Sequence, residues 1–264
     1  MTIGLDVTTL SVTLIVKNEE DNLAECLDTV KWADEIVVLD AGSEDKTIEI
    51  AKRYTNEVHV NSDWKGYGIQ RQRLQELSSC DWVLMLDADE RVTPKLKKEI
   101  QEVLRKDNRD IVYSLPRLSW CFGKFIRHSG WYPDFVTRLY AKNNARYNSQ
   151  LVHEKLDYNS SLRMEKLNGD LLHYTYRDLQ HYLVKSAGYA SAWAQQRQEK
   201  GKSSSLLQGI LHGVACFMKM YVFRFGFLDG KQGLLLALLS AHSTFAKYAD
   251  LWVRQQSSKD GAAS

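Results

Sequence analysis

The fold is decided by Trp82-Val83-Leu84-Met85-Leu86-Asp87-Ala88-Asp89, a short apolar run that ends in two carboxylates. Such a run is typical of a buried parallel strand. Residues i and i+2 of a strand point to the same face, so Asp87 and Asp89 are expected to reach one cation in the turn that follows. Oxygen ligands with open positions suit Mg²⁺ or Mn²⁺, which proteins commonly share with substrate phosphates. An isolated Asp-x-Asp pair more often begins a solvated loop. The surrounding sequence therefore has to show whether this pair is a cation site.

Strand and helix patterns alternate on both sides of this run. Apolar stretches predict strands at 10–16, 35–39, 57–60 and 82–86. Helices are predicted near 23–30, from a cap at Ser43 to about residue 54, over 68–77, and after Thr93-Pro94, a favourable N-cap and N1 pair. This alternation predicts βαβ units, and hence an α/β fold built on a mostly parallel sheet with right-handed crossovers.

Polar residues follow each predicted strand. In open parallel sheets, ligands bind at the carboxyl ends of the strands, so these clusters are expected to line one rim. The clusters are Lys17-Asn18-Glu19, Asp40-Ala41-Gly42-Ser43, Trp64-Lys65-Gly66 and Asp87-Ala88-Asp89. Four clusters on one rim are stronger support for a binding site than any one of them alone.

The pattern changes after residue 110. Short aromatic-rich strands at 111–115, 135–140 and 162–167 predict an antiparallel extension of the sheet. From Arg177 the chain is predicted to be helical, with a hinge at Gly201-Lys202-Ser203-Ser204-Ser205. The expected domains are a catalytic domain at 1–176, a helical region at 177–256 and a frayed tail at 257–264.

Composition narrows the class of protein. The 264 residues are 44% hydrophobic and include three prolines, which favours a folded globular chain. The four cysteines have no metal-binding spacing and are interpreted as reduced thiols. The first ten residues do not resemble a signal peptide. The net charge of +2 hides ten Lys/Arg and four Asp/Glu between Arg177 and Arg254, so this basic third is expected to meet an anionic surface.

Three motifs in the first hundred residues resemble the family 2 inverting glycosyltransferases of the GT-A fold. They are Val16-Lys17-Asn18-Glu19-Glu20, the run from Val38 to Thr47 with Asp40-Ala41-Gly42-Ser43 at its centre, and Leu86-Asp87-Ala88-Asp89-Glu90. The middle segment, from Gly130-Trp131-Tyr132-Pro133-Asp134 to Val152-His153-Glu154, and the helical end are similar to a narrower branch. That branch comprises the β-1,4-glucosyltransferases of lipopolysaccharide inner-core assembly, which use UDP-glucose and a heptose acceptor.

The resemblance implies roles for residues that match the family motifs. Lys17, Asn18, Glu19, Asp40, Ser43, Lys65, Gln70, Arg71, Asp87 and Ala88 would bind the UDP-sugar. Asp89 would ligate a Mg²⁺ or Mn²⁺ ion that bridges the phosphates, joined by Asp87 and by His173. A solvated helix-face charge is the competing interpretation of Arg71, and a buried core histidine that of His173.

An inverting transferase also needs a base near the acceptor hydroxyl. The resemblance favours Glu154 in this role, with Asp134 as the second candidate. Trp131, Tyr132, Arg138 and His153 would then contact the acceptor. Packing is the alternative role for the two aromatic side chains, and His153 could equally orient Glu154.

An apolar stripe runs from Leu206 to Phe225 and is interrupted by His212, Lys219 and Arg224. These interruptions argue against a membrane span, which needs about 18 nearly uncharged residues. We expect amphipathic helices that lie in an anionic membrane interface, so that the protein is peripheral on the cytoplasmic face of the inner membrane. The alternative is that the helices pack on each other or on a second subunit, and the oligomeric state stays open.

Other functions fit the sequence less well. A transferase acting on another cell-envelope glycan stays open. A nucleotidyltransferase would commonly carry a glycine-rich loop where Lys17-Asn18-Glu19-Glu20 stands. An Asp-x-Asp phosphatase would usually carry its pair after the first strand, and a catalytically inert scaffold would not need Asp87, Asp89 and Glu154. No nucleic-acid partner is expected, because the C-terminal aromatic residues lie in the apolar stripe.

Overall fold

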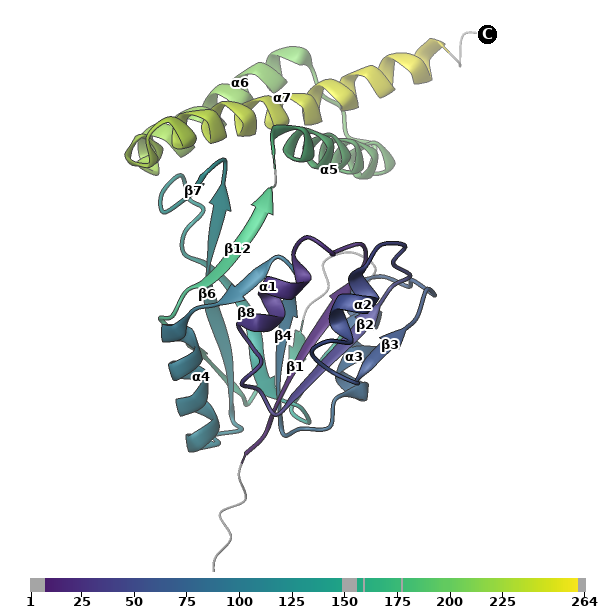
Figure 1. Cartoon of the computed structure of the whole chain (residues 1–264). Coiled ribbons are helices and arrows are strands. Elements are labelled where there is room, and N and C mark those ends of the chain that lie inside the picture. The colour runs from purple at the N-terminus through teal and green to yellow at the C-terminus, as the bar shows by residue number, and fades with distance from the viewer. Residues whose placement is uncertain (1–7, 149–155, 159, 177, 261–264) are drawn as a thin grey trace, which may run out of the picture. The chain divides into compact units, whose positions relative to one another are not determined.

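The computed structural model describes residues 8–148, 156–158, 160–176 and 178–260 (Figure 1). The chain divides into two compact units. The first unit comprises Met1–Arg117 and Asp134–His173, and the second comprises Leu118–Pro133 and Tyr174–Ser264. The predicted domains differ from these units chiefly in the segment Leu118–Pro133, which belongs with the C-terminal helices.

The first unit begins with four parallel strands in the order β3-β2-β1-β4. Their bounds are β1 Leu10–Val16, β2 Glu35–Asp40, β3 Val58–Val60 and β4 Trp82–Asp87. The connecting helices are α1 Leu23–Asp28, α2 Thr47–Ala51 and α3 Tyr67–Leu77. The four strands predicted from apolar runs are confirmed to within a residue at either end, and their parallel pairing places all four carboxyl ends on one edge.

Alternation along the strands fills a core on each face of this sheet. Leu10, Val12 and Leu14 of β1 enter one cluster together with Leu84 and Leu86. Val37, Leu39, Val83 and Met85 enter the other cluster. Because both faces are covered, the strands are apolar at almost every position, which is why they could be recognised as continuous runs.

Antiparallel strands extend the sheet beyond β4, in the order β4-β8-β6-β12-β5. Their bounds are β5 Glu90–Val92, β6 Ile111–Cys121, β8 Asp134–Ala141 and β12 Leu171–Tyr176, with β7 Lys124–Phe125 and β11 Arg163–Lys166 also paired to β6. A separate hairpin pairs β9 Ala145–Tyr147 with β10 Leu156–Tyr158. The predicted extension is confirmed, but an antiparallel β11 is wrong, because β11 runs parallel to β6.

Two predicted helix caps have different outcomes. Thr93 caps helix α4, Pro94–Lys106, by accepting a hydrogen bond from Leu96 N at 3.2 Å. Ser43 does not cap α2, whose N-cap residue is Lys46 without a side-chain cap. The Ser43 hydroxyl donates to the Asp40 carboxylate instead, so it organises the loop after β2.

We expect Thr93→Ala to lower the free energy of unfolding by about 1–2 kcal/mol. The substitution removes the cap and also the bond that the Thr93 hydroxyl donates to Asp170 O at 2.7 Å. Urea unfolding followed by circular dichroism measures the change. Thr93→Ser keeps the hydroxyl and is the matched control, so an equal loss in both variants would contradict the capping role.

The second unit is mainly helical. Its elements are α5 Leu179–Glu199, α6 Leu206–Phe217, the π-helical turn η1 Met218–Phe223, the 3₁₀ turn η2 Gly226–Asp229 and α7 Lys231–Asp260. The predicted hinge is confirmed, since the chain breaks between α5 and α6 and Ser205 forms a capping box with Gln208. Within this unit α5 and α6 each pack along α7 (Figure 1).

The stretch Leu206–Phe223 is 18 residues long, has a mean hydropathy of 1.4 and is mostly exposed. By length and composition alone it could cross a membrane, so the expectation that its charges exclude a span is wrong on that criterion. Such a helix is weak support for a span, since many helices of soluble proteins meet the same criterion.

Candidate functional site

The loops after β1 and β2 are joined by a set of short hydrogen bonds. Asp40, fully buried at the end of β2, accepts from the backbone N–H groups of Gly42 and Ser43, each at 2.8 Å. Asn18 N donates to Ser43 Oγ at 2.9 Å, and Asn18 Oδ1 accepts from Glu44 N at 2.9 Å. The structure therefore brings the predicted nucleotide residues Asn18, Asp40 and Ser43 together, with the exposed Lys17 and half-buried Glu19 beside them.

The polar residues that follow β3 are bound to one another. Lys65 forms an exposed ion pair with Asp63 at 3.0 Å, and Asp63 also holds Arg73 at 3.0 Å. Gln70 is fully buried, where its amide donates to Asp63 O at 3.2 Å and accepts from Arg73. Both predicted ligand-binding residues are thus held within their own segment, and their role toward a nucleotide stays a prediction.

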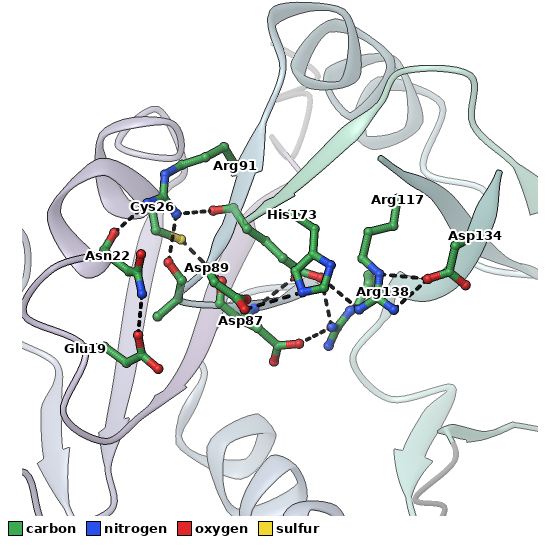
Figure 2. A network of polar contacts seen from close by, with 12 residues as sticks. Glu19, Asn22, Cys26, Asp87, Asp89, Arg91, Arg117, Asp134, Arg138 and His173 are labelled. Atoms are coloured by element: carbon green, nitrogen blue, oxygen red, sulfur yellow. Dashed lines mark hydrogen bonds and ion pairs between the residues drawn. The ribbon is translucent and has the colours of Figure 1, made fainter. Parts of the chain in front are cut away.

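The two carboxylates after β4 have different partners. Asp87 accepts a hydrogen bond from Arg71 Nη2 at 3.1 Å. It also accepts one from Arg138 Nη2, as Figure 2 shows. Burial alone would raise the pKa of Asp87, but the charges of Arg138 and Arg71 outweigh it and hold that pKa well below its usual range. Asp89 instead lies with its Oδ2 3.4 Å from His173 Nε2 (Figure 2).

Strand pairing explains how His173 reaches Asp89. β5 follows the Asp87-Ala88-Asp89 turn directly and pairs antiparallel with β12. In this register His173 stands opposite Glu90, so its ring lies beside the preceding residue, Asp89. A histidine 84 positions away in the chain is therefore placed at the turn by backbone hydrogen bonding rather than by a local motif.

No group of three or more His, Cys, Asp or Glu side chains that could hold a metal ion occurs in the described part of the chain. Asp89 and His173 nonetheless offer one oxygen and one nitrogen donor, and their side chains are 26% and 14% exposed. Mg²⁺ and Mn²⁺ accept such a partial set, because water and substrate phosphates complete the coordination. The engagement of Asp87 with two guanidinium groups disfavours it as a third ligand.

A buried ionic network lies next to the Asp87-Ala88-Asp89 turn and stabilises it. Glu90, which is fully buried, accepts from Asp87 N at 3.0 Å and from Arg138 Nη2 at 3.1 Å. Burial, together with the nearby negative charge of Asp87, raises the pKa of Glu90 against the opposing effect of Arg138. Arg117 lies 3.6 Å from Glu90 and donates to Asp134 at 2.6 and 2.9 Å (Figure 2).

The contacts of this network disfavour the roles predicted for Arg138 and Asp134. Arg138, expected to contact the acceptor, is buried and neutralises Asp87 and Glu90. Asp134, the second candidate for the base, would have to break its ion pair with Arg117 before it could take a proton. Glu90 and Arg117 were missed as site residues, although Glu90 directly follows the predicted metal ligand in the sequence.

A further arginine, Arg91, links the turn to the start of α1. Arg91 Nη1 donates to the carbonyls of Ala88 and Glu90 at 2.8 and 2.9 Å, and Arg91 Nη2 donates to Asn22 O at 2.9 Å. Ala88, predicted to line the nucleotide site, is therefore buried with its carbonyl already bound. Arg71 and Arg138 thus hold the Asp87 carboxylate, and Arg91 holds the backbone of the turn, before any ligand arrives.

A cavity of about 510 Å³ opens beside Asp87. Its volume suits a sugar ring or part of a nucleotide-sugar, and charged and aromatic side chains dominate its lining. The lining includes Arg71, Asp87, Arg117, Arg138, Tyr147 and Tyr158. A slightly larger cavity of about 530 Å³ lies at the C-terminal end of α3 and shares with it only Tyr158. The cavity beside Asp87 is the better candidate site, because the carboxylates and arginines converge there.

The remaining predicted acceptor residues lie elsewhere in the chain. Trp131 and Tyr132 belong to the second unit, where Trp131 packs near Tyr176 and Arg127 lies over the Tyr132 ring at 5.2 Å. Packing, the alternative interpretation of the two aromatic residues, therefore describes what they do within that unit. His153 and Glu154 lie outside the described residues.

The fold and site define an α/β protein whose charged side chains gather at the carboxyl ends of parallel strands, and comparison with known families identifies the class of protein. Residues 11–169 match the model of glycosyl transferase family 2, and this match spans more than half of the chain. The chain belongs to this family and is a glycosyltransferase, with the GT-A fold that the motifs predicted. The match favours glycosyl transfer over the nucleotidyltransferase alternative.

Similar proteins extend over nearly the whole chain. The lipopolysaccharide core biosynthesis glycosyltransferase LpsC of Rhizobium meliloti is 27% identical over 258 residues, covering 91% of this chain and 93% of its own. An uncharacterised glycosyltransferase of Rickettsia prowazekii is 28% identical over 262 residues, covering 94% and 89%. Among solved structures, S. aureus TarS 1–349 in complex with UDP-GlcNAc matches with a TM-score of 0.46 and 14% identity, covering 96% and 92%.

Proposed function

We propose that the protein transfers a hexose, with glucose as the first candidate, from a UDP-sugar to a heptose of the lipopolysaccharide inner core, with inversion at the anomeric carbon. The observation that carries the proposal is the pairing of Asp89 with His173 at the carboxyl end of β4, beside a cavity of about 510 Å³. The similarity to LpsC over most of both chains supports the acceptor class.

In this proposal, different residues at the carboxyl ends of the strands bind different parts of the UDP-sugar donor. Asn18, Glu19 and Asp40 hold the uracil and ribose, since the loops after β1 and β2 are already fixed to one another. Asp87 remains ionised between two arginines. Because its carboxylate is already deprotonated, it can accept hydrogen bonds from the ribose hydroxyls. Arg71 lies next to it and orients the same carboxylate.

Asp89 and His173 are the residues that would hold a divalent cation. When bound, the cation neutralises charge on the leaving diphosphate. The chain's own contribution is a pre-formed ligand pair, because Arg91 and the β5–β12 pairing fix both side chains in place. This arrangement reduces the reorganisation needed when the donor binds.

Substrate and location complete the proposal. We place the reaction at the cytoplasmic face of the inner membrane, where the four free cysteines suit a reducing compartment. A donor screen tests the activity by measuring UDP release from UDP-glucose, UDP-galactose and UDP-GlcNAc, with and without Mn²⁺, against a heptose-containing core acceptor. Acceptor-dependent release with UDP-glucose is expected. Equal release with a heptose-free cell-envelope glycan would instead favour the alternative acceptor.

We expect Glu154→Gln to lower kcat by about 100-fold or more while UDP affinity barely changes. The amide keeps the shape of the side chain but cannot accept the proton of the acceptor hydroxyl. Steady-state kinetics and UDP titration separate the two effects. Asp134→Asn is the comparison variant, because its carboxylate is already paired with Arg117. An active Glu154→Gln with an inactive Asp134→Asn would move the base to Asp134.

A further inference from the structure

The outward side of α6 and the turns that follow it is apolar and open. Six of its large apolar side chains are at least 56% exposed: Leu207, Leu211 and Val214 on α6, followed by Phe223, Phe225 and Leu228. Their exposed fractions run from 56% to 71%. We refer to these six side chains as the apolar face.

The opposite side of α6 is already used for packing. Gly209 and Gly213 press against α7, where an added Cβ would lie 3.1 Å from Phe245 and Tyr248 at Gly209, and 3.1 Å from Ala241 O at Gly213. A surface helix normally buries one apolar stripe and shows polar side chains to water. Helix α6 is apolar on both sides, so the apolar face is a second stripe that no described element of its own unit covers.

The exposed charges of the segment that carries the apolar face are all positive. From Ser203 to Ala246 the sequence contains four charged residues, Lys219, Arg224, Asp229 and Lys231. The three cations are exposed, whereas Asp229 is 2% exposed and accepts from His128 N at 2.9 Å and Arg127 N at 3.2 Å. An apolar surface whose own segment exposes only cations is complementary to lipid tails beneath anionic headgroups.

The hydrogen bonds of the second unit favour an orientation of α6 in the plane of the membrane interface over a membrane span. The turn between α6 and α7 is attached to the segment Leu118–Pro133 of the same unit: Lys124 Nζ donates to Asp229 O at 3.0 Å, and Ser129 N donates to Arg224 O at 2.8 Å. A span would carry this turn and its polar partners into or across the hydrocarbon, where each unsatisfied polar group costs several kcal/mol. An orientation in the plane of the interface leaves every one of these bonds intact.

We infer that the apolar face docks on an anionic lipid bilayer, with α6 lying in the interface and Lys219, Arg224 and Lys231 against the headgroups. This binding site is independent of the proposed function, because none of its residues belongs to the catalytic unit. Docking would hold the enzyme on the surface where membrane-borne acceptors are found. A second copy of the chain is the competing occupant of the same face.

The test uses the full-length protein and sedimentation with vesicles of phosphatidylcholine, with or without phosphatidylglycerol. We expect binding to vesicles that contain phosphatidylglycerol, weakened only partly by high salt, because apolar burial adds to charge attraction. Leu207→Ser/Leu211→Ser should lower partitioning by about tenfold or more. Lys219→Gln/Lys231→Gln should instead remove most of the preference for phosphatidylglycerol.

Val184→Ser is the matched control, since Val184 is 67% exposed but belongs to α5 and is not one of the six side chains of the apolar face. It should bind vesicles like the wild type, and circular dichroism should show all variants folded. Equal loss of binding in Val184→Ser and the double serine variant would overturn the inference. So would a wild-type protein that ignores both vesicles, or one that forms a dimer in solution that Leu207→Ser/Leu211→Ser breaks.

Discussion

Asp89→Ala is expected to reduce sugar transfer by about a thousandfold, which corresponds to about 4 kcal/mol of lost transition-state stabilisation. The variant removes the carboxylate that pairs with His173 and is the best-placed ligand for a diphosphate-bound cation. The fold should survive, because the Asp89 side chain is 26% exposed and contributes no apolar contact to the core. Turnover measured against Mn²⁺ concentration, with UDP binding in parallel, shows whether metal affinity is lost together with activity.

Glu49→Ala is a suitable control for this result, since it removes an exposed carboxylate that forms only an i,i+4 pair with Arg53. It should leave turnover within a factor of about two. The metal-dependent mechanism would be refuted by wild-type protein that keeps near-normal turnover in EDTA. It would be refuted equally by an Asp89→Ala enzyme whose activity matches Glu49→Ala.

Arg138→Met is expected to lower the free energy of unfolding by about 3–5 kcal/mol, the usual cost of removing one partner from a buried ion pair. Arg138 is 4% exposed and contacts both Asp87 and the fully buried Glu90, so its loss leaves two carboxylates facing each other. Urea unfolding at neutral pH measures the loss. Arg105→Met, at a guanidinium that is 73% exposed, should cost no more than about 0.5 kcal/mol.

The pH dependence of the same variant gives a second readout. Arg138 and Arg71 hold the pKa of Asp87 below its ordinary value, so the stability that Asp87 contributes is present above that value and is lost as the pH falls through the lowered pKa. Arg138→Met should move this loss to higher pH. An acid-unfolding midpoint unchanged from the wild type, together with a small loss at neutral pH, would show that the network does not stabilise the turn.

The parallel half of the sheet could be predicted because its signals are local. Apolar runs marked the four strands, and the carboxyl-end rule placed Asn18, Asp40 and Asp87 on one edge. Thr93 with Pro94 marked the start of α4 in the same way. Each of these predictions depends on residues within a few positions of one another, where backbone geometry leaves little choice.

The ion pairs of the site could not be predicted, because they depend on which strands pair. Arg138 reaches Asp87 across 51 residues only because β8 lies next to β4, and Arg117 reaches Glu90 from the next strand along, β6. Nothing in the local sequence reveals that order. The same limit explains β11, whose parallel pairing to β6 has no sequence signal.

Two strands are shared between the units, and this bears on how the enzyme can be re-engineered. β6 passes from the first unit to the second between Arg117 and Leu118, and β12 does so between His173 and Tyr174. The helical unit is therefore not an appended module joined by a linker. A chimera that exchanges it for another membrane-targeting or specificity region would have to cut both strands, one of them directly after the histidine that faces Asp89. Exchange by splicing at loops within the helical unit, such as Gly201–Ser205, would leave both shared strands whole.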